Sequence, residues 1–173
     1  MKKKRPHYIV DGYNLLHVWK EIDIGDLATA REILIRNLIE YGGYENFEIT
    51  LVFDAGKTEE EEREEVYSKI FRVIYSGFDE TADSVIERLS FEEVKKRREV
   101  YVVSSDALIE TVILGAGAYR IPSREFYRAI RRAKKHLRKE YLGNVTLPVQ
   151  RNEVGDRIDS EVLAELEKMR RQR

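Results

Sequence analysis

The amino-acid sequence predicts an α/β fold in which helices cover both faces of a mostly parallel sheet. Short runs of β-branched and aromatic residues alternate with longer segments whose apolar residues recur every three or four positions. This alternation is typical of parallel sheets, because the chain returns from one strand to the next through a helix. The length of 173 residues and the hydrophobic content of 42% suit a domain with a substantial core.

The expected strands are short apolar runs bounded by polar or turn-forming residues. The first run stops abruptly at Asp11 and is followed by Gly12-Tyr13-Asn14 before apolar residues resume. The expected strands are Tyr8–Val10, Glu48–Phe53, Phe71–Tyr75, Val100–Ser104 and a shorter one at Ala118–Ile121.

Helical patterns separate these strands. We expect Gly42-Gly43 to end the first helix, and Ser123 after Pro122 to cap the last long one. The whole chain, residues 1–173, is expected to be one domain, in which residues 142–158 form a loop before a final helix of about Asp159 to Arg170. The apolar stripes that predict the four earlier helices run through Leu27–Tyr41, Ala82–Val94, Ala107–Leu114 and Phe126–Tyr141.

Composition excludes several classes of protein. The chain has no cysteine, so disulfides, thiolate nucleophiles and cysteine-based zinc sites are excluded. No apolar run approaches the 18 or more residues of a membrane span. The basic start, Met1 to Arg5, precedes too few apolar residues for a signal peptide. We therefore expect a cytoplasmic protein without a membrane partner.

Carboxylates recur where the expected strands end. Asp11, Asp54 and Asp106 each follow a strand, and Asp79 and Asp83 lie just beyond another. Parallel strands point their C-terminal ends to one edge of the sheet, where ligands bind in such folds. These acidic residues are therefore expected to meet in one crevice.

Clustered carboxylates repel one another unless a cation neutralises them. Oxygen ligands suit Mg²⁺ or Mn²⁺, which can activate water and stabilise a phosphoryl group under attack. Asn14 adds a neutral amide that could orient a ligand or a phosphate. The sequence thus favours a divalent-metal site at this edge.

Each carboxylate also has an ordinary structural explanation. Asp106 could cap a helix, Asp83 could interact with a helix dipole, and Asp54 and Asp79 could belong to turns. Four such coincidences at one sheet edge are less expected than any single one, which favours the metal site.

The segment from Arg120 to Lys139 is strongly basic, with nine Lys or Arg residues and one acid. These side chains form either the solvated face of an amphipathic helix or a phosphate-binding surface. Tyr13 or Tyr119 could stack on a base. The acidic run Glu59–Glu65 is expected at the surface, or as a flap near the cleft. The candidate RNA-binding residues are Tyr13, Arg120, Arg124, Arg128, Arg131, Arg132, Lys134 and Lys135.

The segment "VDGYNLL", Val10 to Leu16, resembles the signature of the NYN-domain nucleases, in particular their YacP-like branch. Other matching segments cover nearly the whole chain in order. They are "AREILI", "VFDAG" at Asp54, "ETADSVIERL", "VVSSD" at Asp106, "GAGAYRIPSREFYRAI" and "SEVLAELEKMRR".

The resemblance implies a three-layer, PIN-like or Rossmann-like fold and a metal-dependent endoribonuclease that acts on mRNA at the ribosome. Asp11, Asn14, Asp83 and Asp106 are then the catalytic positions. Asp11, Asp83 and Asp106 would hold Mg²⁺ or Mn²⁺, with Asp54 either a further ligand or a structural residue. The resemblance also suggests that Thr81 and Ser105 shape the pocket.

Two other functions are compatible with these residues. An RNA- or ribosome-binding module with little or no cleavage would use the same basic face. A phosphatase-like hydrolase would use Asp11 as nucleophile, but such enzymes usually carry a second acid two residues later, where this chain has Tyr13.

Overall fold

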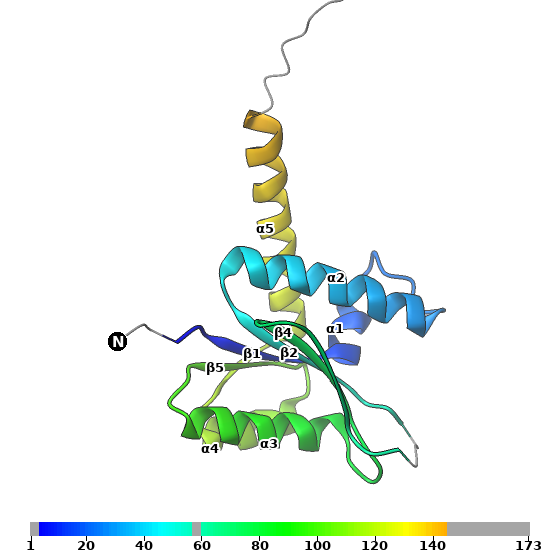
Figure 1. Cartoon of the computed structure of the whole chain (residues 1–173), viewed down its shortest axis with the longest axis vertical. Helices are drawn as coiled ribbons and strands as arrows, with labels where there is room; N and C mark the ends of the chain where they lie inside the picture. Colours follow the sequence, from blue (N-terminus) through cyan, green and yellow to red (C-terminus); the bar gives the residue numbers. More distant parts are fainter. Residues whose placement is uncertain (1–3, 57–59, 145–173) are drawn as a thin grey trace, which may run out of the picture. The chain divides into compact units, whose positions relative to one another are not determined.

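A six-stranded sheet forms the middle layer of the computed structural model, which describes residues 4–56 and 60–144 (Figure 1). The strand order is β3-β4-β2-β1-β5-β6, and every neighbouring pair is parallel except β3 with β4. The strands are β1 (His7–Asp11), β2 (Glu48–Phe53), β3 (Arg63–Ser68), β4 (Phe71–Tyr75), β5 (Val100–Val103) and β6 (Tyr119–Ile121).

Helices cover both faces of this sheet, as the sequence predicts. One face packs against α1 (Gly12–Val18), α2 (Leu27–Glu45) and the first part of α5 (Ser123–Asn144). The other face packs against α3 (Ala82–Lys95) and α4 (Ala107–Ala116). Alternation within β1 explains the two cores, because Val10 belongs to the first and Ile9 to the second. The predicted α/β class and the three layers are thus confirmed.

All five predicted strands are present, but the structure adds a sixth that was not predicted. Part of the acidic run, expected at the surface or as a flap, forms the start of β3, an exposed edge strand. Glu62 forms an ion pair with Arg88 of α3, and the Glu60 carbonyl accepts from the Phe78 N–H at 2.8 Å. The described part of the run is therefore anchored. An edge strand with no buried face lacks the apolar alternation by which strands are identified.

Three predicted helix boundaries are wrong. Gly42-Gly43 lies inside α2, which ends at Glu45 and is capped by Asn46 with φ of 60°. Gly42 packs closely against β2 instead, since a Cβ there would lie 2.9 Å from Ile49 Cδ1. Ser123 is the first residue of α5, and its buried hydroxyl has no hydrogen-bond partner in the described part of the chain. α5 also continues to Asn144, three residues into the predicted loop.

The chain divides into two compact units, residues 1–136 and 137–173. The first contains the whole sheet and helices α1 to α4. The second is described only to residue 144, where it forms the last turns of α5. The organisation of residues 1–173 as one domain stays a prediction, and the predicted final helix lies outside the described residues. Every helix in the described ranges is too short or too polar to cross a lipid bilayer.

Gly12 allows α1 to begin directly on the core. A Cβ at this position would lie 2.3 Å from Phe53 Cε1, so Gly12→Ala must displace either the helix or the ring. We expect this variant to lose about 1–3 kcal/mol of unfolding free energy, the usual cost of overpacking. Denaturant unfolding monitored by circular dichroism measures it.

Gly43→Ala is the matched control. A Cβ there meets no atom within 4 Å, and the residue lies inside α2. This variant should gain about 0.5–1 kcal/mol, because alanine is the better helix former. Equal effects of the two substitutions would contradict the proposed close contact at Gly12.

Candidate active site at the C-terminal edge of the sheet

The sheet topology places the ends of β1 and β5 at a switch point. From β1 the chain adds β2 and β4 on one side and then returns to add β5 on the other side. The crevice beyond the C-terminal ends of strands at such a point is the usual ligand site of open α/β sheets. Asp11 is the last residue of β1, and Asp106 follows the end of β5 by three residues. Two predicted site residues therefore lie at the expected position.

Asp11 is held by two hydrogen bonds from one residue. Its Oδ1 accepts from the Asn14 backbone N–H at 3.0 Å, and its Oδ2 accepts from Asn14 Nδ2 at 2.7 Å. The first bond makes Asp11 the N-cap of α1, a short helix that was not predicted. Asp11 as a whole residue is only 6% exposed. Asp11 therefore caps α1 and also lies at the edge of the sheet.

Asn14 also connects α1 to the loop after β5. Its Oδ1 accepts from the Ser105 backbone N–H at 3.3 Å, while its Nδ2 donates to Asp11. In the same loop, Ser104 Oγ accepts from the Asp106 N–H at 3.1 Å. Asn14 therefore fixes the spacing between the ends of β1 and β5. The role of Ser104 was not predicted, although the "SSD" segment that contains it was singled out.

Asp54 organises the turn after β2 and the start of α3. Its Oδ1 accepts from the Gly56 N–H at 2.6 Å, as expected for a turn residue, and its Oδ2 accepts from the Ala82 N–H at 3.4 Å. The buried Ser76 Oγ, which was not predicted, accepts from the Ala55 N–H at 3.0 Å. Asp54 thus links two of the converging elements, and its role as a metal ligand stays a prediction.

Asp83 lies in the first turn of α3, where the helix dipole favours a negative charge. Thr81 caps the helix, its Oγ1 accepting from the Ser84 N–H at 3.2 Å. Asp79 has φ of 56° and belongs to the preceding turn, in line with its expected structural role. The segment therefore presents Asp83, rather than Asp79, on a helix that begins beside Asp54.

The carboxylates influence one another electrostatically. Burial raises the pKa of Asp83, and the negative charges of Asp11, Asp106 and Asp54 raise it further. Burial also raises the pKa of Asp11, the hydrogen bonds from Asn14 oppose this rise, and the charge of Asp106 adds to it. The charges of carboxylates from four separate segments therefore act on one another at this edge of the sheet.

The donor atoms suit a hard divalent cation, because all are carboxylate or amide oxygens. Within the described ranges, no three carboxylate or histidine side chains stand close enough to form a ready-made metal cluster. Mg²⁺ usually binds through one or two carboxylates together with water and substrate phosphate oxygens. An open site of this kind fits the arrangement around Asp11 and Asp83.

The predicted RNA-binding residues of α5 differ in their surroundings. Arg120, which precedes the helix, forms a salt bridge with Glu110 at 2.8 Å, and Arg131 forms one with Glu21 at 3.0 Å. Lys134 donates a hydrogen bond to Asn37. These three cations connect structural elements. The exposed basic residues that remain among the candidates on the helix are Arg124, Arg128, Arg132 and Lys135.

Four basic residues of α5 form one stripe along the helix. Arg124, Arg128, Arg131 and Lys135 recur every three or four residues and lie opposite the buried side chains of the helix. Tyr13, by contrast, is half-buried and sets its ring edge-on to Phe53, with centroids 5.1 Å apart. Base stacking by Tyr13 stays a prediction.

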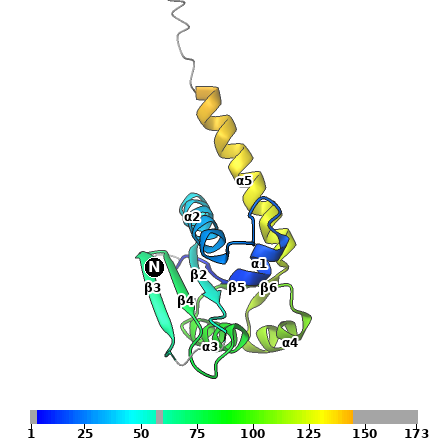
Figure 2. The ribbon, with the colours of Figure 1, turned by 90° about the vertical axis from the view of Figure 1, so that its right-hand side faces the viewer.

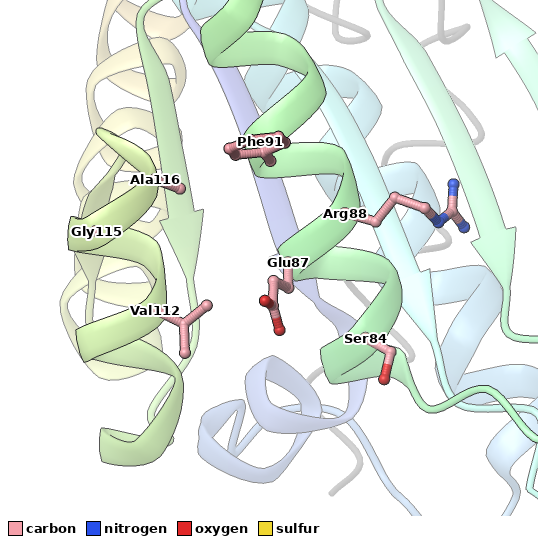
Figure 3. Close-up of a pocket in the computed structure, with 7 residues that line it drawn as sticks. All are labelled: Ser84, Glu87, Arg88, Phe91, Val112, Gly115 and Ala116. Carbon is pink, nitrogen blue, oxygen red and sulfur yellow. The ribbon is translucent and has the colours of Figure 1, made fainter.

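A groove of about 450 Å³ lies between α3 and α4 (Figure 3). It is separate from the candidate site, although one residue that lines it is adjacent to Asp83 in the sequence. The side chain of Arg88 points away from α4, in agreement with its ion pairs to Glu62 and Glu80. Ser84 directly follows Asp83, yet none of the four carboxylates lines the groove. Its lining residues are Ser84, Glu87, Arg88, Phe91, Val112, Gly115 and Ala116.

Comparison with known proteins identifies related chains. The uncharacterized protein YacP of Bacillus subtilis (strain 168) is 31% identical over 138 residues, which are 76% of this chain and 81% of that protein. A crystal structure of Rae1 (YacP) from Bacillus subtilis is similar with a TM-score of 0.68 and 28% identity, covering 95% of this chain and 94% of that one. A tryptophan-to-leucine mutant of Rae1 gives a TM-score of 0.67 and 25% identity, covering 95% and 99%.

The similarity extends to the family level. The family model described as the YacP-like NYN domain matches residues 8–171, which include β1 from its second residue onward, the four carboxylates and α5. The chain belongs to the family of YacP-like NYN domains.

Proposed function

We propose that this protein is a metal-dependent endoribonuclease that hydrolyses phosphodiester bonds in single-stranded RNA. The observation that carries the proposal is the convergence of Asp11, Asp54, Asp83 and Asp106, because the charges of the other three raise the pKa of Asp83. Repulsion between such carboxylates is unfavourable without a cation, and carboxylates whose pKa is raised by like charges are typical of functional sites. Membership in the NYN family, which resembles the PIN-like nucleases, supports the same activity.

In this proposal Asp11, Asp83 and Asp106 hold Mg²⁺ or Mn²⁺, and Asp54 either joins them or positions α3. A divalent ion held by these residues would activate a water molecule and offset the negative charge of the phosphoryl group. Asn14 keeps Asp11 in place through two hydrogen bonds. Because an amide NH₂ group has two hydrogens and one is donated to Asp11, the second can donate to a phosphate oxygen.

The exposed cations of α5 suit the backbone of the substrate. Arg124, Arg128, Arg132 and Lys135 are exposed on the helix that follows β6. Contacts between such cations and phosphates make binding dependent on salt and largely independent of sequence. The substrate implied by the family resemblance is mRNA, presented at the ribosome.

A binding module for RNA or the ribosome is the second candidate. The lack of a ready-made three-ligand cluster within residues 4–56 and 60–144 favours it, because a binding protein needs no metal. In that case the basic face of α5 alone would carry the function. Cleavage assays separate the two proposals.

The assay uses the full chain and an end-labelled single-stranded RNA, with Mn²⁺ or with EDTA. Asp11→Asn and Asp83→Asn should each lower metal-dependent cleavage at least about 100-fold, because metal catalysis contributes several kcal/mol to transition-state stabilisation. Asp79→Asn is the matched control, since Asn also tolerates the positive φ of that turn. This control should cleave like the wild type.

Wild-type rates in the Asp11 and Asp83 variants would contradict the assignment of these residues. RNA that is bound but uncut under every metal condition, including with isolated ribosomes, would favour the binding module instead.

Asp83→Asn should also change stability in a pH-dependent manner. The raised pKa of Asp83 means that repulsion and burial outweigh attraction by the helix dipole in the folded protein. At pH 7 in EDTA the variant should therefore gain at most about 1 kcal/mol, or roughly 2–4 °C in Tm, because exposed charges are screened.

The gain has a defined pH dependence. A carboxyl group whose folded pKa is raised destabilises the fold above that pKa, and the penalty vanishes below the unfolded value of about 3.9. Melting curves should thus differ at pH 7 and coincide near pH 3. Mn²⁺ should raise the Tm of the wild type more than that of the variant. A loss of stability at pH 7, or a difference that persists at pH 3, would oppose this account.

A further inference from the structure

Four aromatic rings form a continuous stack across one face of the sheet. Phe47 stacks on Tyr8 with centroids 4.3 Å apart, Tyr8 on Tyr101 at 4.9 Å, and Tyr101 on Tyr119 at 5.4 Å. The interplanar angles are 26°, 19° and 29°. The stack follows the strand register, in which Tyr8 pairs with Tyr101 and Tyr101 with Tyr119. We name these four residues the aromatic row.

The two ends of the aromatic row differ in exposure. At the inner end, Phe47 is half-buried and Tyr41 meets it edge-on at 6.0 Å. At the outer end, Tyr119 lies in β6, at the edge of the sheet, and is 57% exposed although its ring stacks on Tyr101. The outer end therefore offers an aromatic surface on which another flat ring can stack.

The helix that follows this exposed ring in the chain carries positive charge. β6 leads directly into α5 (Figure 2). Phe126 of this helix stacks on Tyr8 of the row, with ring centroids 5.6 Å apart. Arg124 and Arg128 occupy the first two turns of the same helix and are exposed. Proteins that bind single-stranded nucleic acid without sequence preference combine exposed aromatic rings with cations along the path of the backbone. Tyr13 lacks this arrangement, since its ring packs against Phe53.

We propose that Tyr119 is a stacking platform for a base of the bound single-stranded RNA, and that Arg124 and Arg128 contact the neighbouring phosphates. The inference rests on the proposed function, because it takes single-stranded RNA as the ligand. It adds a binding subsite that is separate from the carboxylates.

The position of Tyr119 determines which nucleotide it contacts. Tyr119 pairs with Tyr101, and the site residue Asp106 lies five residues beyond Tyr101, at most about 17 Å along the chain at roughly 3.3 Å per residue. The base on Tyr119 therefore flanks the scissile phosphate rather than carrying it. Loss of the ring should weaken the binding of long substrates and leave the turnover of bound substrate unchanged.

The experiment measures binding of a long fluorescein-labelled oligouridylate, of about 12 nucleotides, to the full chain in EDTA by fluorescence anisotropy. The variants are Tyr119→Leu, which keeps an apolar side chain over Tyr101, and Tyr119→Phe, which keeps the ring. Tyr67→Leu is the control, because Tyr67 is exposed on β3 at the opposite edge of the sheet.

Tyr119→Leu should weaken binding of the long oligomer about 5- to 150-fold, the loss expected from 1–3 kcal/mol of stacking. Tyr119→Phe and Tyr67→Leu should bind the long oligomer like the wild type. In cleavage assays with the long RNA, Tyr119→Leu should raise KM and leave kcat unchanged.

Three results would overturn the proposal. They are unchanged long-oligomer binding by Tyr119→Leu, an equal loss in Tyr119→Phe, and an equal loss in Tyr67→Leu. In each case normal metal-dependent cleavage by the wild type would leave the nuclease assignment intact. Conversely, ring-dependent binding of the long oligomer without any cleavage would support the platform and contradict the nuclease. A wild type that binds no RNA would overturn both.

Discussion

The pair formed by Asp11 and Asn14 is the interaction on which the candidate site depends. The carboxylate of Asp11 is nearly buried at the end of the central strand, where ionisation is unfavourable. Asn14 donates two hydrogen bonds to this carboxylate, one from its backbone N–H and one from its side-chain amide. The same amide accepts from Ser105 and so fixes the loop that leads to Asp106. One residue therefore stabilises the ionised form of Asp11 and aligns two strands that lie far apart in sequence.

Structural and chemical roles are combined in these carboxylates rather than separated. Asp11 caps α1, and Asp54 closes a turn and contacts the start of α3. Each local hydrogen bond restrains a carboxylate that the charges of the others would push away. The fold thus holds these repelling charges together, and a divalent cation would relieve the repulsion. This explains why an open arrangement, without three preformed ligands in the described ranges, is compatible with metal binding.

The sequence alone predicted which residues lie at the C-terminal edge of the sheet, because that depends only on where each strand ends. Parallel strands share one C-terminal edge, so Asp11, Asp54 and Asp106 could be placed together without knowledge of their distances. Strand order could not be predicted, because the apolar runs do not encode which strand pairs with which. β3 and α1 were missed for different reasons: β3 has no buried face, and α1 is only seven residues long and starts with glycine. The charge of α5 was evident, but only the structure shows that Arg120 and Arg131 form salt bridges.

The central claim is that carboxylates from distant segments form one divalent-cation site. Anomalous diffraction from crystals soaked in Mn²⁺ tests it most directly, because the metal is located without reference to activity. The account predicts a manganese peak within coordination distance of Asp11 and at least one of Asp83 and Asp106. Crystals that bind manganese elsewhere, while this edge holds no peak and the carboxylates remain apart, would contradict it.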